Sequence, residues 1–506
     1  MKRLGILLSV LLLLGLIVGG QLLAQDPVSG GTLKAAWDAE WASLDPHLSS
    51  AYSSFAVLAN VVESLTEFDD NGQLVPMLAE SWEQSDDGLT WTFTLREGVT
   101  FSNGRDFTAE DVKFSYDRIL DPVLGSGRVE NVGGEGAQWE VIDTYTVSVT
   151  TETPVGILPV QLAGSAGGAI IAHESVDDEG QVVIPIGTGP FTIEDLQGTT
   201  ALTLVKNPNY WQEGLPYLDA VDIQVLPEDA PREAALLGGE VDWILSVSAP
   251  GFDALNDDPD IVVDEVGNLG YQYMGLNLEH PPLDDVRVRQ ALAYAIDRQQ
   301  LCDAGDFGRC VVTQGPTGTT SAWHSDYSPY DQDIEKAKQL LAEAGYPDGF
   351  DIEIMPTVTY QNTVRRAEVL QQQLAAIGVN VTINAPEWSQ WLELEGAGNY
   401  DIYTCGWTGL TDGNDFYYLQ HHTDEVFNFT GYSNPEFDRL VEEALTISDF
   451  DERYALYEQA NKILVDEAPY IYFYTPVVTR AYRPFVNGFV VRADNLNRFH
   501  EVWLDQ

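Results

Sequence analysis

The sequence predicts an α/β fold with more than one lobe. Two helical segments, over 334–344 and 363–377, each lead into a strand of alternating hydrophobicity, FDIEI and VNVTI. Such helix-then-strand repetition is typical of a lobe in which helices cover a sheet. In addition, about 480 residues follow the leader segment described below, and that length is too great for one hydrophobic core. We therefore expect two or three lobes.

The amino-terminal segment predicts export. Lys2 and Arg3 precede a nearly unbroken apolar run over 4–18, and small residues then lead to Ala24. This order is that of a secretory signal peptide, to which we assign residues 1–25. An uncleaved membrane anchor is the alternative, because the run approaches the roughly 17 residues that a spanning helix requires. The mature chain is therefore expected in the periplasm or outside the cell, either released or tethered by that anchor.

Net charge is the extreme feature of the composition. The chain has 25 basic and 79 acidic residues, for a net charge of −54. Such a field repels phosphate backbones and anionic lipid surfaces, so binding to nucleic acid or to a membrane surface is disfavoured. The acidic residues are spread along the chain. This spread favours a solvated acidic surface suited to a saline exterior over a cation-binding function.

The other predicted elements mix strands and helices along the chain. Thr108 is expected to cap a helix that has acidic residues in its first turn. The segment 286–301 has the apolar spacing of an amphipathic helix. Further helices are predicted over 231–237, 435–445 and 452–466, and strands over 30–36, 89–95, 241–245 and 470–475.

The three cysteines are too few for a disulfide scaffold. Cys302 and Cys310 bracket a short polar loop, CDAGDFGRC, and could form a disulfide bond in an oxidising compartment. Two free thiols are the alternative, because spacing alone does not show that the Cα atoms approach closely enough. Cys405 lies in an apolar run and is expected to be a buried thiol.

The sequence lacks recognisable motifs for catalysis or for a bound metal ion. His421 and His422 are adjacent, so their rings point apart on a helix or a strand. There is no CxxC, HExxH, GxSxG or phosphate-loop motif, and 79 acidic residues produce carboxylate pairs by chance. We expect a protein that is not an enzyme and has no cofactor. An extracellular peptide or glycan hydrolase with a carboxylate pair is the alternative.

A long run of sequence carries a specific family resemblance. The run over 74–120 reads LVPMLAESWEQSDDGLTWTFTLREGVTFSNGRDFTAEDVKFSYDRIL, and four motifs follow it in order: GTGPF at Gly187, NPNYW at Asn207, VRVRQALAYAIDR at Val286 and GYSNPEFDRLVEEA at Gly431. In these motifs the chain resembles the extracytoplasmic solute-binding proteins of family 5, which serve oligopeptide, dipeptide and nickel ABC importers. The resemblance covers essentially the whole mature chain.

The resemblance implies a three-lobed α/β fold, like that of periplasmic binding proteins, with hinged lobes and a ligand cleft. Lobe I would comprise 26–60, 187–268 and 480–506, lobe II 61–186, and lobe III 269–479. It also implies a monomer that captures an oligopeptide or a similar small polar solute between lobes I and III and delivers it to an ABC permease in the membrane. An oligosaccharide or a chelated metal ion would also suit such a cleft.

The first predicted ligand contacts lie in the loop after the first strand. This loop lines the cleft in proteins of similar sequence, and here it contains Glu40, Trp41 and Leu44. Trp41 offers a stacking surface, and Glu40 offers an acceptor for a cation or a hydroxyl group. The alternative is that Trp41 packs beneath a long loop.

The second set of contacts surrounds a Gly-Trp pair. In the peptide-binding members of the family, an Asp three residues after the Trp pairs with the amino terminus of the peptide, but here that position is Leu410. This departure puts recognition of a free α-amine in doubt, unless Asp412 substitutes for the missing acid. Turn chemistry around Gly413 is the alternative role for the polar residues. The predicted contacts are Trp407, Thr408, Leu410, Asp412, Asn414, Asp415 and Tyr417.

The third set, Trp388 and Trp391, follows the strand VNVTI. Side chains near the carboxyl end of a strand lie where α/β sheets tend to present ligand sites. The two indoles could instead anchor the packing of a helix. As ligand contacts, aromatic surfaces beside carboxylates and amides would suit sugar rings as well as peptide side chains.

Overall fold

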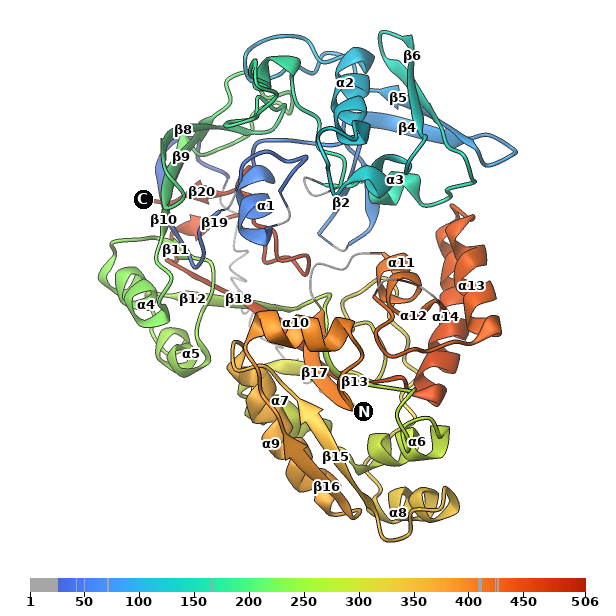
Figure 1. Cartoon of the computed structure of the whole chain (residues 1–506). Coiled ribbons are helices and arrows are strands. Elements are labelled where there is room, and N and C mark those ends of the chain that lie inside the picture. Colours follow the sequence, from blue (N-terminus) through green and yellow to red (C-terminus); the bar gives the residue numbers. More distant parts are fainter. Residues whose placement is uncertain are drawn as a thin grey trace, which may run out of the picture.

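The computed structural model describes residues 26–41, 43–49, 51–70, 72–164, 167–407, 412–423, 425 and 427–506. Over these residues the predicted α/β fold is confirmed, with helices packed around a large mixed sheet and a smaller antiparallel one (Figure 1). The predicted signal peptide lies outside the described residues. Within them, no helix has both the length and the apolar content needed to cross a membrane.

The segments assigned to lobe I build one end of a 12-stranded sheet. The first strand of the chain is parallel to both of its neighbours. Its buried side chains enter a core that includes Trp37, Trp243 and Phe499, whose ring centroids lie 5.5 to 6.1 Å apart. In spatial order the strands are β11 (Trp243–Ile244), β1 (Thr32–Trp37), β10 (Ala220–Val225), β9 (Ala201–Lys206) and β8 (Phe191–Gln197).

Lobe II has an antiparallel sheet of its own. The order is β4 (Ala79–Gln84), β5 (Thr90–Leu95), β7 (Thr146–Thr150) and β6 (Gln138–Asp143). The strand predicted over 89–95 is β5, and the predicted helix is α2 (Ala109–Leu120). Thr108 caps α2 in a reciprocal capping box with Asp111, whose carboxylate accepts the Thr108 N–H at 3.0 Å. Helix α2 packs on the sheet through Tyr116, whose ring lies 4.5 Å from that of Trp139.

Lobe III forms the other end of the 12-stranded sheet, in the order β16 (Val379–Ile383), β15 (Phe350–Met355), β17 (Ile402–Trp407) and β13 (Tyr271–Leu276). Both predicted helix-strand units are present: α8 (Ile334–Glu343) precedes β15, and α9 (Gln361–Ala375) precedes β16. The single helix predicted over 286–301 is wrong. Ile296 is extended, and Asp297 caps a second helix, so the segment forms α6 (Val286–Ala295) and α7 (Arg298–Asp306).

One long strand, β18 (Tyr470–Tyr482), joins the two ends of the sheet. Its first half, from Tyr470 to Tyr474, pairs with β13 of lobe III. Its second half, from Val477 to Tyr482, pairs with β12 (Val262–Gly267) and ends beside β11 of lobe I. The strand predicted over 470–475 is therefore longer than expected. Because β18 pairs with strands of both lobes (Figure 1), it is the candidate for the hinge that the resemblance implies.

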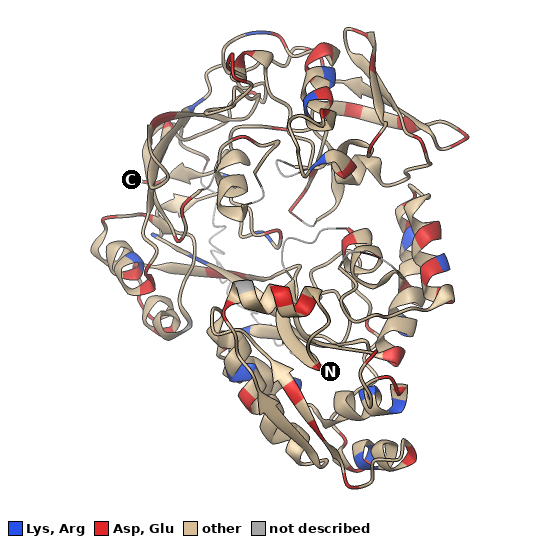
Figure 2. Ribbon diagram, in the orientation of Figure 1, with Lys and Arg blue, Asp and Glu red and all other residues tan. Residues whose placement is uncertain are grey.

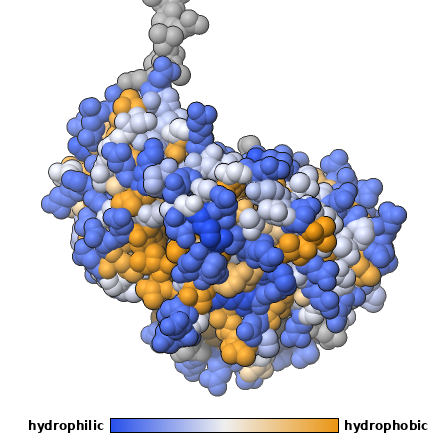
Figure 3. All heavy atoms as spheres, turned by 90° about the horizontal axis from the view of Figure 1, so that it is seen from above, coloured by the Kyte–Doolittle hydropathy of each residue, from blue (hydrophilic) through white to orange (hydrophobic). Residues whose placement is uncertain are grey.

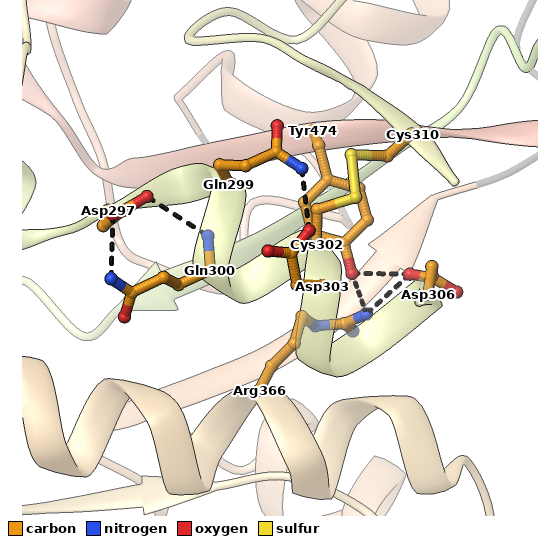
Figure 4. Close-up of a disulfide and its surroundings, with 9 residues drawn as sticks. All are labelled: Asp297, Gln299, Gln300, Cys302, Asp303, Asp306, Cys310, Arg366 and Tyr474. Atoms are coloured by element: carbon orange, nitrogen blue, oxygen red, sulfur yellow. Dashed lines mark hydrogen bonds and ion pairs between the residues drawn. A yellow bond between two sulfur atoms is a disulfide. The ribbon is translucent and has the colours of Figure 1, made fainter. Parts of the chain in front are cut away.

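A disulfide bond joins Cys302 of α7 to Cys310, 6.3 Å apart between their Cα atoms. Cys310 begins β14 (Cys310–Val312), which pairs with β18 next to the hinge. Beneath the disulfide, the Tyr474 hydroxyl donates to Asp306 at 2.5 Å, and Arg366 donates to that hydroxyl at 3.1 Å (Figure 4). The third cysteine, Cys405, is a buried free thiol.

Acidic side chains occur on all three lobes, with few basic side chains among them (Figure 2). The face seen from above is mainly hydrophilic, with apolar patches between the polar groups (Figure 3). This distribution agrees with a solvated acidic surface, as expected from the even spread of charge along the sequence.

Candidate functional site

A cleft of about 720 Å³ lies between the lobes. This volume is typical of small-molecule sites, which span roughly 300 to 1,000 Å³. One wall comes from lobes I and II, through α1 (Tyr52–Leu58), β2 (Thr66–Phe68), the 3-10 helix Val129–Val132, α3 (Leu158–Gln161) and residues 494–498. The other comes from lobe III, through the end of β17, α11 (Gly413–Phe416), α12 (Tyr418–His421) and Phe427. Lobe II thus shares the first wall with lobe I, which the resemblance did not imply.

The wall from lobe III carries four of the predicted contacts: Trp407, Asp412, Asn414 and Asp415. Trp407 is half-buried and packs edge-to-face against Phe427, with ring centroids 5.4 Å apart. Its indole N–H has no hydrogen-bond partner among the described residues. The Trp407–Phe427 pair therefore gives the cleft an aromatic surface on the lobe that is expected to move.

Asp412 lines the cleft but is already engaged by the protein. Its carboxylate accepts a hydrogen bond from Arg453 at 2.5 Å, and both side chains are buried. It also accepts the Asn414 N–H at 2.9 Å and forms a capping box with Asp415 at the start of α11. Asp412 therefore lies at the cleft, as expected for a ligand contact, and also stabilises the turn at Gly413, which was its alternative role. Because Arg453 neutralises its charge, Asp412 is a poor substitute for the acid missing at Leu410.

Four predicted contacts need correction, because the structure places them in hydrophobic cores away from the cleft formed by the described residues. Trp41 and Leu44 belong to the core of lobe I, where the Trp41 indole donates to the Gly198 carbonyl at 3.3 Å. Trp391 donates to the Met355 carbonyl at 3.1 Å, and Tyr417 stacks on another tyrosine of the lobe III core. Each aromatic ring thus packs inside its lobe.

Two further predicted contacts are accessible but lie outside the cleft. Glu40 is exposed, and its carboxylate accepts a hydrogen bond from Thr199. Trp388 is half-buried and stacks on Trp391, with ring centroids 4.8 Å apart, so it anchors α10 (Trp388–Gly396) to the core of lobe III. The last two predicted contacts, Thr408 and Leu410, lie outside the described residues.

The sequence reasoning missed most of the wall opposite lobe III. Arg498 reaches the cleft from the carboxyl-terminal segment and donates to Glu67 at 2.8 Å and to Asp494 at 3.2 Å. Although burial alone would raise it, Arg498 and Arg492 hold the pKa of the Asp494 carboxyl below its usual value. This network is preorganised and internally paired. Glu67 lies 431 residues from Arg498 in sequence, so no local pattern could have revealed that this pair meets at the cleft.

A second missed residue is Arg128, in the polar loop that follows α2. It donates to the Ser49 carbonyl at 2.9 Å and lies over the Phe55 ring, 4.8 Å from its centroid. Its sequence context, GSGRVEN, has neither periodicity nor a motif. The one signal available in the sequence was the rarity of basic residues, since the chain has only 25 of them.

Metal binding by the protein is not supported by the described residues of the cleft. In the described part of the chain, no group of three or more His, Cys, Asp or Glu side chains is placed to hold a metal ion. The described walls of the cleft instead combine aromatic rings, amide groups such as that of Asn414, and seven charged side chains, several of them paired within the protein. Such a surface suits a polar organic ligand with apolar side groups.

Comparison with known proteins gives a consistent result. Residues 73–428 match the family described as bacterial extracellular solute-binding proteins, family 5. The glutathione-binding protein GsiB of Salmonella typhimurium is 30% identical over 464 residues, which cover 89% of this chain and 90% of that protein.

Solved structures agree with this match. HbpA2 from Haemophilus parasuis has a TM-score of 0.85 and 29% identity, covering 94% of this chain and 100% of that one. The periplasmic binding protein DppA from Helicobacter pylori, in complex with the peptide STSA, has a TM-score of 0.77 and 29% identity, covering 95% and 99%.

Proposed function

The chain belongs to the bacterial extracellular solute-binding proteins of family 5, and we propose that it captures a short peptide in the interlobe cleft and delivers it to an ABC permease in the membrane. The observation that carries the proposal is the position of the cleft. Its two walls belong to lobes that pair with different halves of β18, so we expect a rotation about this strand to change the distance between the two sets of contacts.

Binding would shift the balance between open and closed forms. A ligand held only by Phe55 and its neighbours on the first wall gains nothing from closure. A ligand that also touches Trp407 and Phe427 binds the closed form more tightly and so increases its population. Closure also removes water from the ligand, which strengthens its hydrogen bonds. The permease would then recognise the closed form. No bond is made or broken, so the cleft needs no catalytic residue.

Two lines of support favour a peptide. Among similar proteins, GsiB is named for glutathione, DppA was solved with the peptide STSA, and a dipeptide-binding protein from Pseudoalteromonas, 25% identical, was solved with Met-Leu. In this chain, the rings of Trp407 and Phe427 offer surfaces for side chains. The amide of Asn414, whose Oδ1 atom has no hydrogen-bond partner among the described residues, offers a group that matches a peptide backbone.

Family membership and the predicted signal peptide also give the expected compartment. We expect a monomer outside the cytoplasmic membrane, because family 5 proteins are extracellular and the predicted signal peptide precedes the fold. Mass analysis of the mature amino terminus distinguishes a released protein from one tethered by residues 1–25.

Calorimetry with a panel of dipeptides to pentapeptides, beside a matched panel of oligosaccharides, tests the proposal. We expect saturable binding of peptides with no change in their mass after incubation. Trp407→Ala should weaken that binding about tenfold or more, because a central aromatic contact is typically worth over 1 kcal/mol.

Trp388→Ala is the matched control, since it removes an indole of the same lobe outside the cleft. The control should bind peptide like the wild type. Binding of oligosaccharides alone, hydrolysis of the peptides, or equal losses in both variants would each contradict the proposal.

A further inference from the structure

Arg128 differs from the other cation on the described walls of the cleft. Arg498 donates to two carboxylates, those of Glu67 and Asp494. Arg128 forms no ion pair with any carboxylate in the described chain. The one hydrogen bond that its side chain makes among the described residues, from Nη2 to the Ser49 carbonyl, uses one of the five N–H groups of the guanidinium. The other four have no acceptor among the described residues.

The local structure holds this guanidinium in place. The Phe55 ring supports one face of it, with the centroid 4.8 Å from the guanidinium carbon. Both Phe55 and Arg128 line the cleft. A planar group that is stacked and hydrogen-bonded along one edge has lost much of its freedom before a ligand arrives, and its remaining N–H groups stay available for bidentate contacts.

The nearest acid in the sequence does not neutralise Arg128. Glu130 also lines the cleft, two residues further along, but its side chain folds back toward Gly134, where its Oε2 atom lies 3.2 Å from the position that a Cβ would occupy. The half-buried Arg128 therefore keeps its charge without an acidic partner. Burial lowers the pKa of its guanidinium, as expected for a cation without a counterion. In a chain with a net charge of −54, an unpaired cation at the cleft is notable.

We propose that Arg128 binds a carboxylate of the ligand and thereby selects peptides that carry a free acid on the side facing lobe II. The inference rests on the proposed function and extends it to a specific contact. Two N–H groups of a guanidinium match the two oxygens of a carboxylate in geometry and charge. The surplus of acidic groups elsewhere in the protein disfavours polyanions, so a zwitterionic peptide fits better than an acidic one.

The test compares one peptide in three forms. The tightest-binding peptide of the panel is prepared as the free acid, as the carboxyl-terminal amide, and as an amide with one Glu side chain. Wild-type protein should bind the free acid about 10- to 100-fold more tightly than the amide, because a hydrogen bond to a charged group is worth about 1.5 to 3 kcal/mol. If the amide with a Glu side chain regains the affinity, the carboxylate that binds is that of a side chain. If it does not, the terminal carboxylate is the one that binds.

The variants identify the residue responsible. Arg128→Gln should lower the affinity for the free acid about 10- to 100-fold and leave that for the amide within about twofold. Arg128→Lys should restore part of the loss, since it keeps the charge without the planar fork. Arg439→Gln is the control for charge, because this exposed arginine of lobe III lies outside the cleft.

Two outcomes would overturn the assignment. One is a wild-type protein that binds acid and amide equally. The other is an Arg128→Gln variant that loses both by the same factor, since that result indicates a structural role. If no peptide binds at all, the proposed function fails by itself. Succinate and succinamide then test Arg128 independently, with a preference for succinate expected in the wild type and absent from Arg128→Gln.

Discussion

Lobe II and lobe III are attached to lobe I in different ways. At the junction of lobes I and II, Arg118 of α2 donates to both oxygens of Asp45, at 3.0 and 2.6 Å, and lies 2.9 Å from His47. Nearby, the buried Glu63 carboxylate accepts hydrogen bonds from Thr188 at 2.7 Å and from Trp211 at 2.9 Å. These contacts are buried and lie at separate places in the junction. We therefore expect lobes I and II to behave as one rigid body.

The junction of lobes I and III depends mainly on β18 and on a smaller contact beside it. Arg309, next to the disulfide, donates to Glu265 of β12 at 2.7 Å and lies over the ring of Phe252 in α5 (Ala249–Asn256). Figure 1 places α5 and the cleft helix α11 on opposite sides of β18. Lobe III also touches lobe II directly, because the Gly156 N–H donates to the Leu445 carbonyl at 2.9 Å. From the difference between the junctions with lobe I, we expect lobe III to be the part that moves. A contact behind the hinge should stretch when the cleft closes.

The largest effect is expected where the rigid junction is broken. Asp45→Ala leaves Arg118 buried without its counterion and should lower the free energy of unfolding by about 3 to 5 kcal/mol. Urea denaturation measures this loss as a lower midpoint. Arg439→Gln removes an exposed pair and should cost about 0.5 kcal/mol or less. Equal losses in the two variants would mean that the junction is not held by its buried charges.

A pH titration of stability tests the same junction through Glu63. Burial raises the pKa of its carboxyl from 4.5 to about 7, although Thr188, Trp211 and Tyr210 donate to it. The folded state therefore binds this proton more tightly than the unfolded state. It follows that the free energy of unfolding should fall as the pH rises from about 4.5 to about 7.

Glu63→Gln should make the pH-dependent fall in the free energy of unfolding smaller by about 3 kcal/mol. Urea denaturation at each pH measures this free energy. A remaining slope is expected from Glu395 in lobe III, because burial raises the pKa of its carboxyl to about 8. An unchanged pH profile in Glu63→Gln would show that the native Glu63 does not hold its proton in this range.

The smallest effect concerns the contact behind the hinge. Arg309→Met removes an ion pair and a cation–π contact between lobes I and III, each worth about 0.5 to 1 kcal/mol, and closure is expected to stretch both. The variant should therefore bind peptide about threefold to tenfold more tightly, with slower dissociation, although it lies outside the cleft. Calorimetry and stopped-flow kinetics measure both quantities. Unchanged or weaker affinity would mean that this contact does not favour the open form.

Much of the fold could be predicted because it depends on local periodicity. The segments 334–344 and 363–377 formed helices followed by strands, as their spacing indicated. The break at Ile296 was missed because apolar spacing continues through it, whereas an N-cap at Asp297 interrupts the helix. A family resemblance supplied the hinge and the cleft, which no local pattern contains.

The site was predicted less well, for physical reasons. Trp41 and Trp391 are aromatic residues in segments where ligand contacts are expected. However, each indole N–H donates to a backbone carbonyl inside its lobe. Periodicity does not show which face of a loop is buried. No sequence pattern marks Arg128. Its proposed role depends on the absence of a carboxylate partner, and only the three-dimensional arrangement of the described residues shows that absence.

The proposed capture of a peptide requires lobe III to close over it. Spin labels at Val123 of lobe II and Asp326 of lobe III, both highly exposed, report the distance between the two bodies by electron–electron double resonance. Saturating peptide should shorten and narrow the distance distribution, and Arg309→Met should shift the peptide-free distribution part of the way. A distribution that stays the same at saturation would contradict capture by hinge closure.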